Sequence, residues 1–426
     1  MPRPRIVLVP LALLAVVACT LPNSPFISPD AVITPASATW AIQQEAANGV
    51  NAFATDLYTQ LRDESGNLIF SPYSVSTALA MTAAGAQGNT RAEMDKVLHL
   101  PTSEKLSPGY RELTTIVTRP PSGAKHKPEL SVANSLWHQK GHAWKKEYLA
   151  VAQDDFRATL FGADFVHDPD DARGRINRWV AKETHDHIRD LVPSGAIGAD
   201  SRLVLVNAIY FKAKWGTPFE KKDTKQELFT LASGQRIRAP LMNQKGDFFL
   251  REQADLQVLQ LPYDGGATSM YVLLPRTADG LPALEQKLTA ENLTRWTLGR
   301  GKMPLEEVKV WLPKFKFTVP FELTPVLQKM GMSEAFDGQK ANFKGMSEHP
   351  EGLFVSRVIH KAFVELDEVG TEAAAATAVS MGLATAAPAP PVRVKEFRAD
   401  HPFLFIIKHE PTGAVLFLGR VLDPTK

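Results

Sequence analysis

The sequence predicts a single α+β domain on the strength of three observations. Some segments repeat apolar side chains at the three- and four-residue steps of a helix, whereas others alternate them every second residue, as strands do. These segments follow one another from residue 41 to residue 426 with no linker-like stretch between them. No internal repeat divides that span. With 426 residues, 44% of them hydrophobic and 22% charged, the chain can bury a sizeable core.

Residues 1–40 are expected to lie outside this domain. Arg3 and Arg5 precede an apolar run over residues 6–18, which has the length of a signal-peptide core and is short for a membrane span. The run ends in Val-Val-Ala-Cys and resembles a bacterial lipoprotein signal, in which the cysteine becomes the lipidated first residue. We therefore predict a lipoprotein signal peptide over 1–19 and a flexible tether, rich in Pro, Ser and Ala, over 20–40.

This interpretation implies an exported protein that stays on the cell envelope as a lipoprotein. An ordinary secretory signal with an incidental cysteine is the alternative, and it would send the protein to the extracellular space. The only membrane contact expected is through a lipid on Cys19, the single cysteine of the chain. A single cysteine also excludes a disulfide within the chain.

Periodicity and capping residues predict the first helices. The apolar residues on one helix face are Val50, Phe53, Leu57 and Leu61. A second helix begins where Ser71 can cap it and Pro72 occupies its first turn, which requires no backbone N–H. Thr90 and Glu93 have the spacing of a capping box for a third helix.

A longer helix is predicted over residues 172–191, where apolar residues again recur at helical steps. His185 and His187 belong to this segment. Residues two apart point to different sides of a helix, so the two histidines would make a poor metal pair. We expect both side chains to be solvated.

The longest strand is predicted over residues 202–219, a nearly continuous apolar run that is typical of a buried central strand. Asn207 lies inside it, and a buried amide is costly without hydrogen-bond partners, so Asn207 is expected to have polar neighbours. Strands are also predicted over residues 129–139 and within the region 247–275. A final strand pair is expected at 403–408 and 414–421.

The segment over residues 360–391 changes character in the middle. It begins as a strand, in which Ala362, Val364 and Leu366 alternate with the residues between them. After Gly370 only small or short side chains follow until Met381. Composition alone favours a short exposed helix or a linker. Placement between strands favours a segment that is exposed at one time and enters a packed sheet at another, because close-packed interiors tolerate extra volume poorly.

The segment 368–378, Glu-Val-Gly-Thr-Glu-Ala-Ala-Ala-Ala-Thr-Ala, resembles the hinge of the reactive-centre loop of the serpins, the serine protease inhibitor superfamily. The Phe-Ser-Pro-Tyr-Ser run at 70–74 and the C-terminal residues 397–424 also resemble that family. With its predicted signal, the chain looks like a bacterial lipoprotein-type member. The resemblance implies a serpin fold over 41–426, with three β-sheets, about eight to nine helices and an exposed reactive-centre loop over about 368–392.

The resemblance also assigns candidate site residues. The hinge would be Glu368, Gly370, Thr371, Glu372, Ala373, Ala374, Ala375, Ala376 and Thr377. The residues at the shutter and breach of the main sheet would be Ser71, Ser74, Asn207, His360 and Trp215. The family's usual distance from Gly370 puts the reactive bond at Ala384-Thr385, and Leu383 or Ala387 remain open because the following loop, with its prolines, is long. Val369 replaces an acidic residue that is common at this hinge position.

The function implied by the resemblance is suicide inhibition of serine proteases, with cysteine proteases as a second class. A target cleaves the loop and forms a covalent acyl complex, and the hinge then inserts into the main sheet as a new strand. Thr371, Ala373 and alternate residues after them would face inward. Ala384 suits elastase-like or subtilisin-like enzymes. The alternative is a non-inhibitory, envelope-tethered binding protein, in which bulky, charged or proline residues are common over 373–379, where this chain has none.

Enzyme chemistry has no sequence support. The chain lacks a G-x-S-x-G elbow, an H-E-x-x-H motif, a Walker loop and a C-x-x-C pair, so we expect no enzyme, no metal and no cofactor. An enzyme site assembled in space from the eleven histidines and the carboxylates stays as an alternative. A net charge of +2 with scattered basic residues indicates no nucleic-acid partner, and a monomer is expected.

Overall fold

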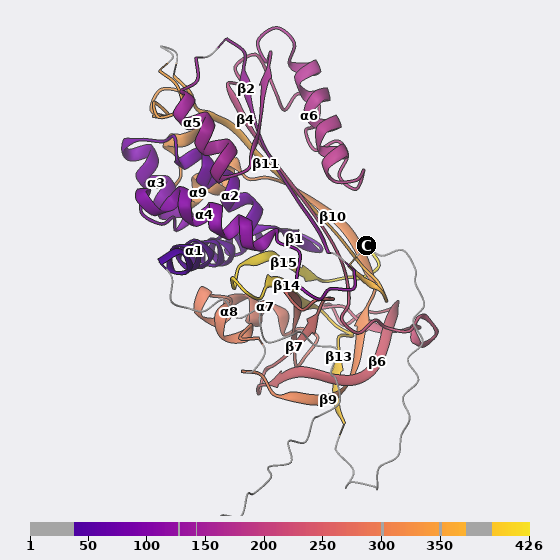
Figure 1. Cartoon of the computed structure of the whole chain (residues 1–426). Helices are drawn as coiled ribbons and strands as arrows, with labels where there is room; N and C mark the ends of the chain where they lie inside the picture. Colours follow the sequence, from indigo (N-terminus) through magenta and orange to yellow (C-terminus); the bar gives the residue numbers. More distant parts are fainter. Residues whose placement is uncertain (1–37, 127, 142, 300–301, 349–351, 372–393) are drawn as a thin grey trace, which may run out of the picture.

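The computed structural model describes residues 38–426 except 127, 142, 300–301, 349–351 and 372–393 (Figure 1). The predicted signal peptide and Cys19 lie outside the described residues. Helix α1 (Ala38–Leu61) begins slightly before the predicted domain start at residue 41, since Ala38 and Ala41 are strong helix formers. None of the helices in the described part of the chain is long and apolar enough to cross a membrane.

A six-stranded sheet forms the long axis of the molecule (Figure 1). Its strand order is β10-β11-β12-β4-β2-β3. The strands are β2 (Glu129–Gln139), β3 (Thr159–Ala163), β4 (Leu203–Lys214), β10 (Phe315–Glu322), β11 (Val355–Leu366) and β12 (Gly370–Thr371). β4 is central and almost wholly buried, as its nearly continuous apolar sequence predicts.

A nine-stranded sheet lies below it, with the path β1-β15-β14-β8-β7-β6-β9-β13 and β5 paired to β6. Its strands are β1 (Leu68–Phe70), β5 (Lys225–Thr230), β6 (Arg236–Glu252), β7 (Leu256–Pro262), β8 (Thr268–Pro275), β9 (Leu305–Pro313), β13 (Lys395–Arg398), β14 (Phe403–His409) and β15 (Val415–Val421). The second and third of the expected sheets are joined here, because β6 pairs with β5 and β9 along most of its length and with β7 at its end.

Helices cover both faces of the six-stranded sheet. α6 (Pro169–Glu183) lies on one face, and the helical layer around α2 lies on the other (Figure 1). The remaining helices are α2 (Pro72–Ala83), α3 (Gly88–Leu98), α4 (Ser103–Val117), α5 (Lys146–Ala150), α7 (Leu281–Gln286), α8 (Ala290–Trp296) and α9 (Thr324–Met330). The described residues thus confirm the predicted α+β fold and its number of helices.

Helix α2 begins as the sequence predicts. Ser71 caps it by accepting a hydrogen bond from the Ser74 backbone N–H at 3.2 Å, and Pro72 occupies the first turn. Every residue of the helix is buried. α2 therefore lies directly beneath the six-stranded sheet, and it carries Ser74 there.

The capping box predicted for Thr90 and Glu93 is wrong. α3 begins at Gly88, before Thr90, so both residues are already inside the helix. The Glu93 carboxylate instead accepts hydrogen bonds from the backbone N–H groups of Ser333 and Glu334 at 2.7 and 2.8 Å. The acidic side chain thus ties α3 to a distant segment, which local spacing alone does not reveal.

The helix predicted over residues 172–191 is shorter than expected. α6 ends at Glu183, and His185, Asp186 and Asp190 have positive φ angles of 49°, 65° and 50°, which a right-handed helix excludes. The Asn177 side chain bonds to both the N–H and the C=O of Val192, at 2.8 and 2.9 Å, and so holds the chain in a packed turn. The apolar residues after Glu183 are buried in this turn, which explains why their spacing looked helical.

Candidate functional site

The centre of the six-stranded sheet is a seam between β4 and β11. These strands pair directly and in parallel from Val355↔Leu203 to Ala362↔Ile209. Beyond that point β12 lies between them, with Thr371 opposite Ala213 of β4 on one side and Leu366 of β11 on the other. The seam is therefore closed over most of its length and open at one end, where it already holds a two-residue strand.

Gly370 enters the seam because it has no side chain. A Cβ atom at this position would lie 2.0 Å from the Ala213 carbonyl oxygen and 2.7 Å from the Lys214 Cα. Real Cβ atoms do not approach backbone so closely, so any other residue would force the strands apart. The predicted hinge glycine thus occupies a position that only glycine fits.

A tight corner precedes Gly370. The Asp367 carboxylate accepts hydrogen bonds from the backbone N–H groups of Val369 and Gly370 at 2.8 and 3.2 Å. Trp215 donates its indole N–H to the Asp367 carbonyl at 3.0 Å and its backbone N–H to the Val369 carbonyl at 2.8 Å. Trp215, predicted for the breach, therefore holds the corner from which the hinge starts.

Glu368 anchors the same corner through its side chain, which is almost fully buried. Its carboxylate accepts hydrogen bonds from the Thr224 hydroxyl and the Lys314 ammonium, both at 2.8 Å. Burial would raise the pKa of Glu368, but these two hydrogen bonds outweigh it, so the pKa lies below its usual value. Val369, which departs from the family pattern, is buried beside it and carries no charge into the corner.

Thr371 faces inward, as the alternation predicts. Its hydroxyl shares a hydrogen bond with the Tyr263 hydroxyl at 2.7 Å, beneath the sheet. The Tyr263 ring in turn stacks on Trp215, with centroids 4.6 Å apart and planes 9° from parallel. Trp215 and Tyr263 therefore hold the hinge from two sides, one at its corner and one at its first inserted side chain.

Further down the closed part of the seam, the predicted shutter residues come together. Asn207 of β4 donates to the Ser74 hydroxyl and to the Asn134 side-chain carbonyl, both at 2.5 Å. His360 of β11 lies opposite Asn207, and its Nδ1 is 2.7 Å from the Asn207 Oδ1. Since one partner is on β4 and the other on β11, this hydrogen bond crosses the seam itself.

The hydrogen bonds of His360 determine its protonation. The Ser71 backbone N–H donates to Nε2 at 3.0 Å, so Nε2 is an acceptor and carries no proton. Nδ1 must then carry the proton and donate it to Asn207. Burial lowers the pKa of His360 to about 3, so the ring is neutral at physiological pH. A general base of this strength would be weak, and the role that fits His360 is a structural hydrogen bond.

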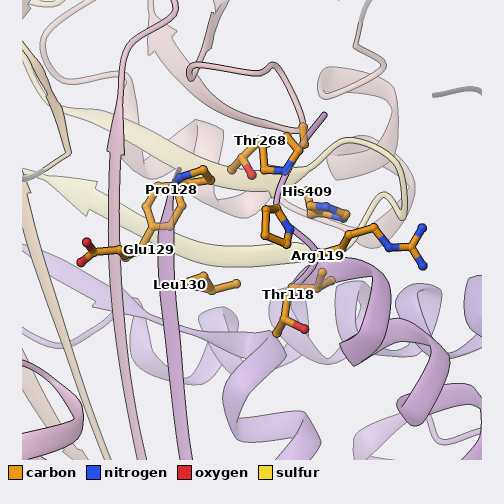
Figure 2. Close-up of a pocket in the computed structure, with 12 residues that line it drawn as sticks. Thr118, Arg119, Pro128, Glu129, Leu130, Thr268 and His409 are labelled. Atoms are coloured by element: carbon orange, nitrogen blue, oxygen red, sulfur yellow. The ribbon is translucent and has the colours of Figure 1, made fainter. Parts of the chain in front are cut away.

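A pocket of about 230 Å³ lies beside the open end of the seam, between the end of α4 and the start of β2 (Figure 2). Phe211 of β4 lines it and also contacts Tyr263 edge-on, at 5.1 Å between centroids. His409 lines it too, and burial lowers the pKa of His409 to about 3. A buried histidine with so low a pKa is a poor general base near neutral pH.

Several predicted site residues lie outside the described residues. These are Cys19, the hinge residues Glu372, Ala373, Ala374, Ala375, Ala376 and Thr377, and the reactive bond Ala384-Thr385. Within the described part of the chain, no group of three or more His, Cys, Asp and Glu residues is arranged to hold a metal ion.

Asn134, Tyr263 and Lys314 are among the residues of this site that the sequence analysis missed. Asn134 has the same signal as Asn207, an amide inside an apolar strand, and could have been found by that rule. Tyr263 and Lys314 carry no local signal, since each acts on a residue more than fifty positions away in the chain. Only the folded arrangement identifies them.

Comparisons with known proteins give a consistent result. Residues 48–424 match the family model described as serpin (serine protease inhibitor). Leukocyte elastase inhibitor A of Rattus norvegicus is 40% identical over 390 residues, which cover 90% of this chain and 100% of that protein. A highly specific serpin of the insect Tenebrio molitor matches with a TM-score of 0.78 and 31% identity, over 89% of this chain and 98% of its own. Arabidopsis AtSerpin1 in its native stressed conformation matches with a TM-score of 0.77 and 31% identity. The match covers 90% of this chain and 99% of AtSerpin1.

The neutral state of His360 predicts how stability depends on pH. The unfolded chain protonates this histidine near its ordinary pKa of 6.5, whereas the folded protein does so only near pH 3. The stabilisation is therefore complete above pH 6.5 and is lost as the pH falls toward 3, at about 1.4 kcal/mol per unit of pH. His409 adds a second contribution of the same sign. Urea unfolding at pH 7.5 and 5.5 should show the loss.

The variant His360→Leu separates this contribution from the rest. It should be less stable than the wild type at pH 7.5, because Asn207 and the Ser71 N–H lose a partner. It should also lose less stability than the wild type on going to pH 5.5. The control His185→Asn changes an exposed histidine at a positive φ angle, which asparagine tolerates, and should follow the wild type. Equal pH slopes for all three proteins would show that His360 is not held neutral.

Proposed function

This chain belongs to the serpin family, and we propose that it is an inhibitory member that traps serine proteases by loop cleavage and strand insertion. A target protease attacks the loop between Ala384 and Thr385 and becomes esterified to the new C-terminus. The freed hinge then extends β12 along the seam between β4 and β11. The attached protease is carried along the sheet and distorted before water can complete the reaction.

The observation that supports this mechanism best is the half-open seam. Gly370 and Thr371 already pair with β4 and β11 as a short strand between them. Further residues that follow in the same register would form hydrogen bonds alternately to β4 and to β11. About fifteen residues at roughly 3.3 Å each would span about 50 Å, comparable with the size of the domain.

The register also identifies the side chains that an inserted hinge residue would contact. Continuing the antiparallel pairing from Thr371↔Ala213 and Leu366↔Thr371 would place residue 377 between Asn207 and His360. Residue 377 is threonine, and its hydroxyl can donate to and accept from those two side chains. Insertion would thus break the hydrogen bond across the seam and offer a replacement for it at the same place.

The small side chains of the hinge fit the same mechanism. Inward positions after Thr371 would be Ala373, Ala375, Thr377 and Val379, all small enough to enter an already packed interior. A non-inhibitory serpin needs no such restriction. The envelope-tethered binding protein remains the outcome to expect if no protease is trapped.

The proposed target class is elastase-like or subtilisin-like serine proteases. Ala384 offers a small apolar side chain at the cleaved bond, whereas a basic residue first occurs at Arg393. The rat relative is named an elastase inhibitor, which agrees with a small residue at this position. We further propose that the protein is exported, acts as a monomer and is held at the cell envelope by a lipid on Cys19, as a bacterial lipoprotein-type serpin.

Incubation with a panel of proteases tests the inhibitory function. Elastase-like and subtilisin-like enzymes should form a complex that survives boiling in detergent, whereas trypsin should not, because Ala384 leaves its primary pocket unfilled. Mass spectrometry of the released peptide should find Thr385 at its N-terminus. Release after Arg393 would place the reactive bond elsewhere, and cleavage without any stable complex would favour the binding protein.

Hinge variants test insertion separately from cleavage. Thr371→Arg would bury an unpaired charge beside Tyr263, and Ala375→Pro would remove a ladder hydrogen bond in a central strand. Both should be cleaved as the wild type is but should release active protease, so the denaturing gel should show cleaved inhibitor and almost no complex. The control Thr371→Val keeps the size of the side chain and should still trap. Undiminished trapping by both test variants would exclude insertion as the mechanism.

Lipidation of Cys19 has its own test. Metabolic labelling with a radioactive fatty acid should mark the wild-type protein in the membrane fraction. Cys19→Ser should remain unlabelled and leave that fraction, because no other cysteine can replace it. Equal labelling of both proteins would rule out this anchor.

A further inference from the structure

The turn after α6 places one aromatic ring against both strands of the seam. The His187 ring stacks on Tyr210 of β4 with centroids 5.0 Å apart and planes 8° from parallel. It also stacks on Phe363 of β11, at 4.8 Å and 30°. His187 was expected to be solvated, and that expectation is wrong: the ring is half-buried and bridges two different strands.

The bridge stands at the point where the seam opens. Direct pairing of β4 with β11 ends at Ile209↔Ala362, and Tyr210 and Phe363 are the next residues on each strand. Both are buried on the face that α6 covers, in the apolar cluster that also contains Ile188 and Leu191. The first strand residues that lie apart at the open end are thus the two that His187 holds.

The turn that carries His187 is firmly attached. Ile188 is fully buried, and its backbone N–H donates to the Thr184 hydroxyl at 3.1 Å. Lys361 of β11 donates to the Arg189 carbonyl at 2.8 Å. The turn is therefore held by its own hydrogen bonds and is tied to β11.

Entry of a new strand is incompatible with this bridge. In the register of β12, residue 374 would pass between Tyr210 and Phe363, and the inserted strand would lie about 4.8 Å from each of its two neighbours. The side chain of residue 374 would point to the same face as these two rings and would enter the space between them that the His187 ring occupies. At least one of the two stacking contacts must break before the hinge can pass.

We propose that His187 is a clamp across the seam, which slows strand insertion by holding Tyr210 and Phe363 together. This inference rests on the proposed function, because it sets the rate of the insertion step. A closed clamp protects the intact protein from inserting its own hinge prematurely. The same clamp lengthens the time that an attached protease has for completing hydrolysis, so it tunes the ratio of trapped to released enzyme.

The sheet supplies a matched control on the same face. Trp179 of α6 contacts Trp137 of β2 and Phe161 of β3, edge-on, at 6.5 and 5.7 Å between centroids. This is also an aromatic bridge from the same helical segment across two neighbouring strands. β2 and β3 pair with each other and do not lie at the seam, so loss of Trp179 leaves insertion untouched if the clamp depends on position.

The experiment measures how fast each variant takes up a synthetic peptide of residues 371–384, followed by the shift on a native gel and by the gain in heat resistance. His187→Ala should take up the peptide about three to ten times faster than the wild type, since one to two stacking contacts no longer have to break. His187→Phe keeps a ring that can stack and should stay near the wild-type rate. Trp179→Ala should also match the wild-type rate.

A second measurement separates the clamp from a general packing role. His187→Ala should lower the melting temperature of the intact protein more than that of the loop-cleaved, inserted form, because at least one stacking contact is already broken there. Trp179→Ala should lower both. An equal loss in both forms for His187→Ala, or equal acceleration by Trp179→Ala, overturns the clamp.

The two hypotheses fail in different ways. If the wild type takes up the peptide and traps protease while His187→Ala behaves identically, only the clamp is wrong. If the wild type neither takes up the peptide nor traps any protease, β4 and β11 do not part, and the proposed function fails together with the clamp.

Discussion

The structure depends on the contact between β4 and β11. These central strands are held together by their backbone ladder, by the Asn207–His360 hydrogen bond and by the rings around His187. The hinge residues placed near them are compatible with both a closed and an open seam. Gly370 has no side chain, Thr371 is small, and the covering turn contacts both strands without belonging to either.

The buried polar cluster beneath the seam joins β4, β11 and α2 through hydrogen bonds. Asn207, Ser74, Asn134 and His360 satisfy one another, and a neutral histidine avoids the cost of a buried charge. An apolar cluster of the same volume would hold the strands without any preference for their register. The hydrogen bond between Asn207 and His360 instead requires one register of β4 and β11. It is also the side-chain bond that must be replaced when the two strands separate.

Sequence predicted those features that local chemistry determines. The cap of α2 at Ser71 and the burial of β4 both follow from spacing and residue type. The sequence predictions were wrong where a side chain contacts a segment that is distant in the chain. Glu93 has the spacing of a capping box but bonds to Ser333 and Glu334, and the apolar residues after Glu183 repeat like a helix although a turn buries them. His187 looked solvated because its partners, Tyr210 and Phe363, come from two strands that only the fold brings beside it.

The direction of the strands determines whether insertion of β12 residues can be reversed. β4 and β11 run parallel, whereas β12 is antiparallel to both. Lengthening β12 exchanges one parallel ladder for two antiparallel ones, which doubles the number of interfaces and replaces slanted hydrogen bonds with the more stable perpendicular kind. The reverse exchange would have to give up both new ladders at once. Under the proposed mechanism each molecule acts once, so its supply must be set by synthesis and not by recycling.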